Sequence, residues 1–454
     1  MTLARRIVIA ANRLPVARVE DQWQTSPGGL VSALVPIVQE RGGSWVGWTG
    51  MADFAPEPFS HDGIEHRPVP LSPADLDGYY YGFCNRTLWP LYHDALRVPQ
   101  YHRHWWVPYR EVNRRFAEET ASALQANDVA WIQDYQLQLV PGMLRELRDD
   151  VTIGFYLHIP FPPLELFARL PWRREVLDGL LGADVVTFQT RLGRHNFARC
   201  AKRFAGAEGG TRQLRVGNRT VRLKTAPISI DTPRFIAAAK SPSVRELAAR
   251  LRSELGEDRT VVLGVDRLDY TKGIDVRLRA FEALLETHPA DDLVFVQIAV
   301  PSREEVDDYS AMRSEVEQIV GRINGSYGRP GHVPVHYLYR SVPFEDLVAY
   351  YTIADVMTVT PLRDGLNLVA KEYVASRVQG DGVLMLSEFA GAAQELQSAL
   401  LVNPHDLDGV VAFLEEAVAM PEDEQRLRMA RMRRHVQRHD IFDWAQKCLA
   451  DLNA

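Results

Sequence analysis

The sequence has few cysteines, no long hydrophobic run and no excess of positive charge, and each shortage excludes a class of protein. Only three of the 454 residues are cysteines, and Cys84, Cys200 and Cys448 lie far apart without a C-x-x-C pair. This spacing argues against a disulfide-stabilised fold and against a zinc site. No apolar stretch approaches the length that crosses a bilayer, and the apolar run 6–11 is too short for a signal peptide. We therefore expect a cytoplasmic protein.

The charge balance gives no sign of a polyanionic partner. The formal net charge is -7 and the isoelectric point is about 6.0, so we expect neither nucleic acid nor an anionic membrane as a general partner. This balance still permits local basic pockets for phosphate groups. With 46% hydrophobic and 24% charged residues, the chain has the composition of a soluble globular protein of two or three domains.

Short apolar runs typical of buried strands alternate with helical stretches along the whole chain. This alternation predicts parallel sheets covered by helices on both faces. Two successive α/β units are expected, each long enough to fold by itself. We place the first at residues 1–232 and the second at 233–430, with a C-terminal helix at 431–454 that packs back on the first unit. The fold class is therefore α/β with two Rossmann-like domains.

Polar residues follow several of the predicted strands, where ligands bind in open α/β sheets. Asp134 and His158 both come directly after buried strands, and Arg13 ends the first strand. A single histidine or arginine at such a place is more often structural or solvated. Two polar residues expected on the same rim favour a binding site.

Glycine-containing turns with charged flanks suggest phosphate binding. Gly28 and Gly29 precede a helix, although a pair of glycines alone is weak evidence. Arg267 and Lys272 flank a loop between a strand and a helix, which suits a diphosphate because arginine binds phosphate as a fork and lysine as a point charge. The alternative is a surface ion pair with the neighbouring aspartates.

The stretch 360–373, TPLRDGLNLVAKEY, is the most informative part of the chain. It links a strand to a helix through a polar turn in which Asp364 is a fixed acceptor. We expect Gly365 to adopt backbone angles closed to other residues, and the free N–H groups of the helix start to form a hydroxyl or anion site. Glu372, about two turns further along, could reach a sugar hydroxyl. The short R-D-G fragment alone fits an ordinary loop equally well.

Two segments are rich in aromatic residues, YYYGFCNRTLW at 79–89 and YHRHWW at 101–106. Such density suits a flat wall for a sugar ring, but an aromatic core or a subunit contact is the better interpretation for most of these side chains. His102 and His104 alternate as metal ligands on a strand would. No third ligand accompanies them, so we expect no metal site here.

The motifs together resemble one family closely. ANRLPV, SPGGL, WVGWTG, LWPLYH, WIQDYQLQLVP, GFYLHIPFP, GVDRLDYTKGI, GRINGSYG, TPLRDGLNLVAKEY and LSEFAGAA occur in order from Ile7 to about Leu449. This set is similar to that of the trehalose-6-phosphate synthases, retaining glycosyltransferases that join nucleoside-diphosphate glucose to glucose 6-phosphate. The resemblance implies a GT-B fold, in which two Rossmann-like domains face each other across a cleft.

The resemblance also implies roles for individual residues. The acceptor site would comprise Arg13, Trp48, Tyr80, Trp89, Asp134 and Arg303, with Arg13, Tyr80 and Arg303 on the 6-phosphate. The donor site would comprise Gly28, Gly29, His158, Arg267, Lys272, Asp364, Gly365, Leu366, Asn367, Leu368 and Glu372. The residues closest to the chemistry would be Asp134, His158, Arg267, Lys272 and Asp364. Gln133 and Gln136 stand where many relatives have histidines, which rules out a role for those imidazoles here.

The implied reaction is a front-face substitution that needs no metal and no cofactor besides the sugar nucleotide. The partners would be these two small molecules and further copies of the chain, as a dimer or a tetramer. The donor base remains open among uracil, guanine and adenine. Three alternatives also remain: a synthase using another phosphorylated acceptor such as glycerol 3-phosphate, a non-catalytic sugar-phosphate sensor, and a general nucleotide-binding protein.

Overall fold

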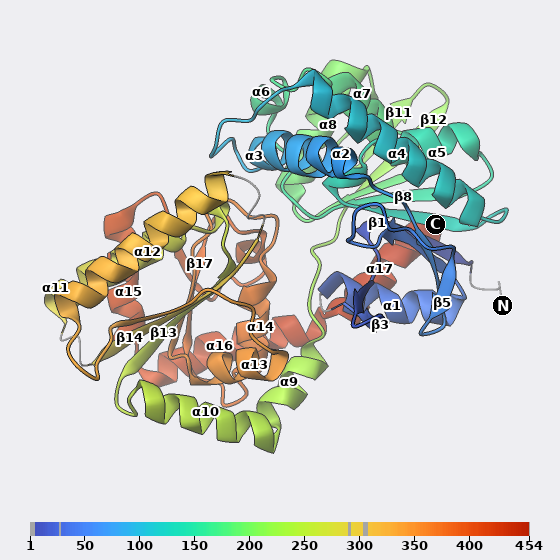
Figure 1. The fold of residues 1–454 in the computed structure, drawn as a ribbon. Coiled ribbons are helices and arrows are strands. Elements are labelled where there is room, and N and C mark those ends of the chain that lie inside the picture. The colour runs from blue at the N-terminus through green and yellow to red at the C-terminus, as the bar shows by residue number, and fades with distance from the viewer. Residues whose placement is uncertain (1–4, 27–28, 289–291, 303–306, 454) are drawn as a thin grey trace. The chain divides into compact units, whose positions relative to one another are not determined.

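The computed structural model divides the chain into two compact units, shown in Figure 1. It describes residues 5–26, 29–288, 292–302 and 307–453. The first unit comprises Met1–Ile228 and Phe442–Ala454, and the second comprises Ser229–Ile441. The boundaries between the two units therefore fall after Ile228 and after Ile441. The sequence analysis placed them after residues 232 and 430.

The first unit is built on one twisted sheet with the strand order β10-β11-β12-β9-β8-β7-β1-β4-β6-β5. Its parallel strands are β1 (Ile7–Arg13), β4 (Ser44–Trp48), β6 (Ile64–Pro68), β7 (Val129–Gln133), β8 (Thr152–Leu157), β9 (Val185–Phe188) and β12 (Arg219–Thr225). The antiparallel edges are β5 (Phe59–His61), β10 (Glu208–Gly209) and β11 (Gln213–Val216), and β2 (Val16–Val19) pairs separately with β3 (Gln22–Thr25). The strand order reverses between β1 and β7, so the ligand-binding crevice expected of such a sheet lies there.

Helices surround this sheet. They are α1 (Gly29–Arg41), α2 (Pro73–Asp75), η1 (Leu76–Leu88), α3 (Trp89–Tyr92), α4 (Arg103–Ala123), η2 (Tyr135–Leu137), α5 (Val140–Leu147), α6 (Leu164–Phe167), α7 (Arg173–Leu180), α8 (Arg191–Ala205) and α17 (Ile441–Asn453). His102 caps α4 and His104 lies in its first turn, both exposed. The segment is therefore helical and not a strand, and Trp105 and Trp106 begin the buried stripe of this helix.

The first aromatic segment forms a π-helix, η1. The Trp89 N–H group donates to the Cys84 carbonyl, an i to i+5 bond, where η1 ends. In this wider helix, buried side chains do not recur with a period of 3.6 residues. The ring centroid of Phe83 lies 4.4 Å from that of Tyr109, and the ring of Tyr79 lies 5.9 Å from Tyr109. The core interpretation is confirmed for these side chains.

The second unit contains a fully parallel sheet with the order β15-β14-β13-β16-β17-β18. Its strands are β13 (Thr260–Arg267), β14 (Leu293–Val300), β15 (Val335–Leu338), β16 (Val356–Val359), β17 (Val383–Ser387) and β18 (Leu400–Val402). Its helices are α9 (Thr232–Lys240), α10 (Pro242–Leu255), η3 (Tyr270–Lys272), α11 (Ile274–Thr287), α12 (Asp307–Tyr327), α13 (Phe344–Ile353), α14 (Leu368–Ser376), η4 (Gly391–Gln394), α15 (Leu407–Val418) and α16 (Glu422–Arg438). In chain order the strands run 3-2-1-4-5-6, so the order reverses between β13 and β16.

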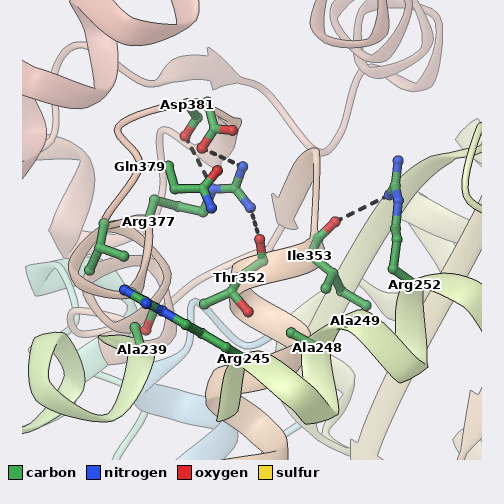
Figure 2. Close-up of a pocket in the computed structure, with 12 residues that line it drawn as sticks. Ala239, Arg245, Ala248, Ala249, Arg252, Thr352, Ile353, Arg377, Gln379 and Asp381 are labelled. Atoms are coloured by element: carbon green, nitrogen blue, oxygen red, sulfur yellow. Dashed lines mark hydrogen bonds and ion pairs between the residues drawn. The ribbon is translucent and has the colours of Figure 1, made fainter. Parts of the chain in front are cut away.

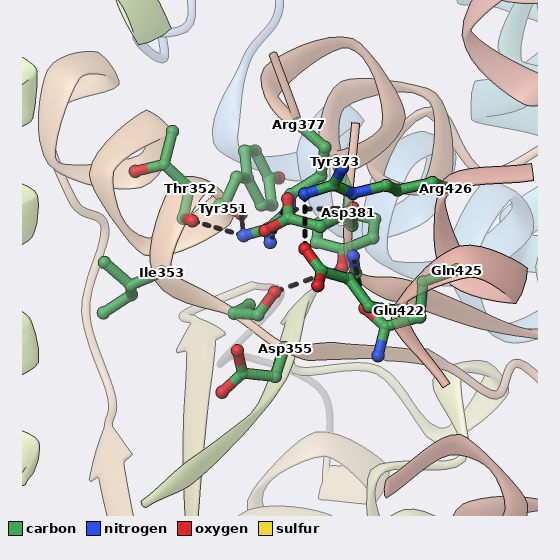
Figure 3. Close-up of polar contacts among 12 residues, drawn as sticks. Tyr351, Thr352, Ile353, Asp355, Tyr373, Arg377, Asp381, Glu422, Gln425 and Arg426 are labelled. Atoms are coloured by element: carbon green, nitrogen blue, oxygen red, sulfur yellow. Dashed lines mark hydrogen bonds and ion pairs between the residues drawn. The ribbon is translucent and has the colours of Figure 1, made fainter. Parts of the chain in front are cut away.

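The C-terminal part of the chain serves both units. Gln425 lies in the first turn of α16 and accepts a hydrogen bond of 2.9 Å from the N–H group of Gly382, just before β17. Figure 3 shows Gln425 among the polar contacts of this region. The single C-terminal helix expected at 431–454 is wrong, because α16 ends at Arg438 and the chain turns at His439 before α17 begins. Helix α17 then completes the first unit. Across the described residues, we find no helix whose length and apolarity would suffice to cross a bilayer.

Candidate active site

In the first unit, a cationic and aromatic cluster forms beyond the carboxyl ends of β1 and β4. The two strands are parallel neighbours, and after a register shift between Ala10 and Arg13 they bring Arg13 opposite Trp48. The Arg13 guanidinium carbon lies 4.8 Å from the Trp48 ring centroid, and the Tyr80 ring lies 6.3 Å from that of Trp48. Arg13 is exposed and has no ion pair among the residues that the structure describes. Its charge is therefore available to an anion, with the Trp48 ring beside it.

Other predicted acceptor residues lie elsewhere or outside the described residues. Trp89 is only 4% exposed, and its ring lies 5.8 Å from Tyr135 and 4.1 Å from His93. It therefore packs beneath the loop that follows β7. Arg303 lies outside the described residues. Of the two glycines predicted for the donor site, Gly28 also lies outside them, and Gly29 is the first residue of α1.

Asp134 and His158 lie together on the rim of the first sheet, as the strand-end argument predicted. Asp134 Oδ1 accepts a hydrogen bond of 3.1 Å from the His158 N–H group. The Asp134 N–H group donates to the Tyr156 carbonyl at 2.8 Å. Asp134 has a left-handed backbone with φ of 71°, which is uncommon for a residue with a side chain. Such strain is typical of functional sites, and here it directs a carboxylate at the switch point between β1 and β7.

The ring of His158 is held by the side chain of Gln133. Its Nε2 atom lies 3.0 Å from Gln133 Oε1, and Gln133 is buried at the end of β7. Burial lowers the pKa of His158 to about 3, so the ring is neutral near pH 7. With the amide carbonyl as acceptor, Nε2 carries the proton and Nδ1 presents a lone pair. The sequence marked Gln133 only as a replacement for histidine, and its contact with His158 was missed.

In the second unit, two predicted donor residues form an ion pair at the switch point. Lys272 Nζ lies 2.6 Å from Asp364 Oδ2, and the side chains are only 9% and 14% exposed. Lys272 follows β13 and Asp364 follows β16, so adjacent parallel strands bring them together. Asn367 also donates to Asp364 Oδ2, at 3.2 Å. For Lys272, the partner is therefore not one of the neighbouring aspartates but a residue 92 positions away.

The close approach of the two loops depends on Gly273. This residue has φ of 58°, and a Cβ atom added to it would lie 2.2 Å from the Thr360 carbonyl oxygen. The Thr360 hydroxyl donates to the Gly273 carbonyl at 3.0 Å, and the Leu362 N–H group donates to the Thr271 carbonyl at 2.8 Å. Glycine is therefore required for the backbone angle and for the space.

A buried arginine supports the Lys272 loop and was missed by sequence reasoning. Arg277 is 1% exposed, and its guanidinium donates to Asp266 at 2.5 Å, to the Lys272 carbonyl at 2.8 Å and to the Thr358 carbonyl at 2.9 Å. Burial raises the pKa of Asp266, and the charges of Arg277 and then Lys272 oppose this rise. The available signal was the place of Arg277 among the apolar positions of α11, where a charged residue needs a buried partner.

The turn before α14 differs from the expectation in one respect. The left-handed residue is Asn367, with φ of 80°, rather than Gly365. Asn367 caps the helix by accepting a hydrogen bond of 3.3 Å from the Ala370 N–H group. Leu366 is 3% exposed, so its side chain belongs to the core and only its backbone is offered to a ligand. Leu368 is the first residue of α14.

Glu372 lies in α14, which follows this turn, and Arg267 is the last residue of β13. Tyr351 donates its hydroxyl to Glu372 Oε2 at 2.8 Å. Burial raises the pKa of Glu372, and the hydrogen bond from Tyr351 opposes this rise. In the described part of the chain, Tyr351 is the one group that holds this carboxylate, which leaves Oε1 for a ligand. Arg267 ends β13 and is exposed.

A comparison with protein families decides the assignment of this chain. The model of glycosyltransferase family 20 matches residues 1–454. The chain belongs to glycosyltransferase family 20. It is 54% identical to the trehalose-6-phosphate synthase of Mycolicibacterium smegmatis, over 98% of this chain and 92% of that protein.

Solved structures give the same result for the fold. A structure from Escherichia coli bound with UDP-2-fluoro glucose has a TM-score of 0.92 and 37% identity, over 98% of each chain. A UDP-forming alpha,alpha-trehalose-phosphate synthase from Burkholderia xenovorans, in complex with glucose-6-phosphate, has a TM-score of 0.91 and 34% identity, over 99% of this chain and 100% of that one. This family 20 glycosyltransferase therefore has the GT-B fold.

The second unit of the glycosyltransferase also contains a pocket of about 390 Å³ away from this rim (Figure 2). Its charged groups are mostly neutralised within the protein. Arg377 pairs with Asp381 at 2.6 Å, and Arg252 pairs with Asp355 at 2.9 Å. These aspartates precede β16 and β17, so the pocket lies at the amino ends of the strands. It is therefore not the candidate active site.

In the part of the family 20 chain that the structure describes, no three histidine, cysteine, aspartate or glutamate residues are grouped so that they could hold a metal ion.

Proposed function

We propose that this glycosyltransferase transfers glucose from a nucleoside-diphosphate glucose to glucose 6-phosphate and forms α,α-trehalose 6-phosphate with retention of configuration. The observation that carries the proposal is the pair of Lys272 and Asp364 at the β13–β16 switch point. Support for the substrates comes from the solved neighbours, which bind UDP-2-fluoro glucose and glucose 6-phosphate.

On the donor side, Lys272 and Arg267 bind the diphosphate. Departure of the nucleoside diphosphate builds negative charge on its β-phosphate, and a cation placed beforehand stabilises that charge by about 3–4 kcal/mol. When the donor binds, the Lys272 ammonium group turns from Asp364 to the phosphate. Asp364 then accepts a hydrogen bond from a hydroxyl group of the donor glucose. The backbone from Gly365 to Leu368 holds the same sugar.

The remaining donor contacts involve the ribose, the phosphates and the sugar ring. Tyr351 donates to Glu372 Oε2, and the other carboxylate oxygen, Oε1, accepts hydrogen bonds from the ribose hydroxyls. The backbone at Gly28 and Gly29 approaches the diphosphate. His158 hydrogen-bonds the donor glucose as a neutral imidazole, since burial keeps its pKa far below 7.

On the acceptor side, Arg13 and Tyr80 bind the 6-phosphate together with Arg303. The exposed guanidinium of Arg13 over the Trp48 ring supports this role. Trp48 provides an apolar face for the sugar ring, and Trp89 supports the loop that carries Asp134. Asp134 accepts a hydrogen bond from an acceptor hydroxyl.

The proposed chemistry is a front-face substitution. The bond between the donor anomeric carbon and the leaving phosphate oxygen breaks, and a bond from that carbon to the anomeric oxygen of the acceptor forms on the same face. The leaving phosphate oxygen takes the proton of the acceptor hydroxyl, so configuration is retained without a covalent intermediate. A glycosyl adduct trapped on Asp364 would overturn this mechanism. We also propose that no metal is required, so activity should survive EDTA.

A product assay tests the function. Purified protein is incubated with glucose 6-phosphate and UDP-, GDP- or ADP-glucose in turn, and nucleoside diphosphate release is followed with product mass and anomeric NMR. An α,α-linked disaccharide phosphate is the expected result, with UDP-glucose as the first donor to test because of the E. coli neighbour. Turnover only with glycerol 3-phosphate would change the acceptor. Binding without turnover would favour a sensor.

The proposed enzyme is a cytoplasmic homo-oligomer, a dimer or a tetramer. Light scattering of the purified chain tests its assembly, and a monomer at all concentrations would contradict it.

A further inference from the structure

The first unit contains a pocket lined mainly by basic side chains. It has a volume of about 820 Å³ and lies among the start of α8, the hairpin β11–β12 and helix α17. Its charged lining residues are Arg191, Arg194, Arg212, Arg222, Lys224 and Asp451. Five cations therefore face one carboxylate, in a chain whose net charge is -7.

The protein neutralises only one of these cations. Lys224 Nζ lies 2.5 Å from Asp451 Oδ1. None of the four arginines has an ion pair with any residue that the structure describes. In the pocket of Figure 2, by contrast, two arginines are paired with aspartates of the same unit. Unbalanced charge of this kind is costly in a concave site and indicates that an anion completes it.

Unsatisfied polar atoms give a second observation. Arg194 Nε and Thr225 Oγ1 are both buried and lack a hydrogen-bond partner among the described residues. Burial lowers the pKa of Arg194, and the charges of Arg212 and Arg191 lower it further. Buried donors without partners are rare in folded proteins, and bound ligands are a common reason for them. Both residues belong to the lining of the pocket.

The pocket is distinct from the candidate active site. Its lining comes from the start of α8, from the segment before and at the start of β11, from β12 and from Asp451, whereas Asp134 and His158 follow β7 and β8. None of its lining residues has a role in the proposed transfer reaction.

We propose that this pocket is a second ligand site, which binds a small phosphorylated metabolite through the guanidinium groups of Arg194 and Arg222. Guanidinium groups bind phosphate oxygens as a fork. The volume falls within the range of roughly 300–1,000 Å³ that is usual for small-molecule sites. The concave shape and the overall negative charge of the chain favour a small ligand over an extended nucleic acid. Binding stabilises the first unit by mass action.

Calorimetric titration with inorganic pyrophosphate tests the site. The full chain carries Lys272→Ala throughout, which removes the proposed diphosphate contact of the active site. In this background, Arg194→Gln with Arg222→Gln should weaken pyrophosphate binding at least about tenfold, because two charge-assisted contacts are lost. Lys202→Gln with Arg203→Gln is the matched control, since it removes two exposed charges of α8 outside the pocket. This control should change the affinity less than about twofold.

A second variant keeps the proposal testable if the double variant does not fold. Arg212 is exposed, so the Arg212→Gln variant should fold. Without an anion its melting temperature should rise, because the repulsion between Arg212 and Arg194 is removed. The stabilisation of this variant by pyrophosphate should be smaller than that of the parent protein. Competition by a sugar phosphate or by a free nucleotide then distinguishes the two sources of the phosphate group. Unchanged affinity in the pocket variants, equal loss in the control, or binding of a DNA duplex but not of pyrophosphate would overturn the proposal.

Discussion

At the scale of single residues, the contact between Gln133 and His158 determines the charge of the ring. The amide is neutral, and burial lowers the pKa of His158 to about 3. In Gln133→Glu, a carboxylate would stabilise the imidazolium form and raise this pKa. We expect the His158 ring to titrate at a higher pH in this variant, as followed by NMR of its ring nitrogens, and kcat to acquire a new pH dependence. In Gln133→His the ring should stay neutral, and an unchanged titration in Gln133→Glu would refute the assigned contact.

The same lowered pKa makes a prediction about stability. The folded-state pKa of about 3 lies below the ordinary value of 6.5, so between these values the unfolded state binds the extra proton. The contribution of His158 to the free energy of unfolding is therefore fully present above pH 6.5 and falls by about 1 kcal/mol per pH unit on acidification. Urea unfolding at pH 7, 6 and 5 should show a steeper loss for the wild type than for His158→Gln. Parallel losses would contradict the neutral ring.

Lys272 is the residue on which the proposed transfer depends most. Lys272→Ala removes the cation that faces the leaving diphosphate, and we expect kcat to fall about 100- to 1,000-fold. Steady-state kinetics with saturating donor and acceptor measures this loss. Lys240→Ala is the control, because Lys240 is exposed in the same unit. A Lys272→Ala enzyme with the wild-type kcat would exclude Lys272 from stabilisation of the leaving group.

The positions of single residues were predictable where these residues follow a strand that the sequence pattern predicts. Arg13, Asp134, His158 and Lys272 follow predicted strands, and the structure places them on the rims of the two sheets. Arg277 was not predicted, because its role depends on partners that only the packing of α11 brings within reach. The roles of all these residues in catalysis stay proposals.

At the scale of elements, the loops after β13 and β16 meet only because position 273 is a glycine. Gly273→Ala would combine an unfavourable backbone angle with a clash against the Thr360 carbonyl oxygen. We expect a lower free energy of unfolding in urea and a higher donor KM, since the displaced loop carries Lys272. Gly380→Ala is the matched control: Gly380 has φ of 84° but no atom within 4 Å of an added Cβ. The control should lose only the backbone cost of about 1–2 kcal/mol, and equal losses would contradict the steric argument.

The sequence predicted strands more reliably than unusual helices and turns. Apolar runs such as residues 129–132 and 261–265 are buried strands in the structure, because short β-branched runs between turn residues have few other solutions. The π-helix η1 was not predicted, since its residues do not follow the usual helical period. The left-handed residue was expected at Gly365 but is Asn367, because asparagine both caps α14 and tolerates positive φ.

At the scale of the whole molecule, the first unit is discontinuous in sequence. Helix α17 belongs with a sheet that is complete by Thr225, about 200 residues earlier in the chain. Its amphipathic pattern alone predicts only a packed helix, and we expected the C-terminal helix at 431–454 to pack back on the first unit. The contact partners decide this: the Trp444 ring lies 5.6 Å from that of Trp131 and 5.3 Å from that of Tyr156. The stability of the first unit therefore depends on the last residues of the chain.

Trp444→Ala tests this dependence. Trp444 is 3% exposed, and its indole N–H donates to the Ala226 carbonyl at 3.2 Å. Loss of a buried tryptophan costs about 3–5 kcal/mol, so the melting temperature of the first unit should fall by roughly 10 °C. Hydrogen exchange in moderate urea should show β7 and β8 opening early in the variant, while β13 and β16 keep wild-type protection. Phe442→Ala is the control because Phe442 is 39% exposed. Equal early opening of both sheets would mean that the two units unfold as one, against the division seen in the structure.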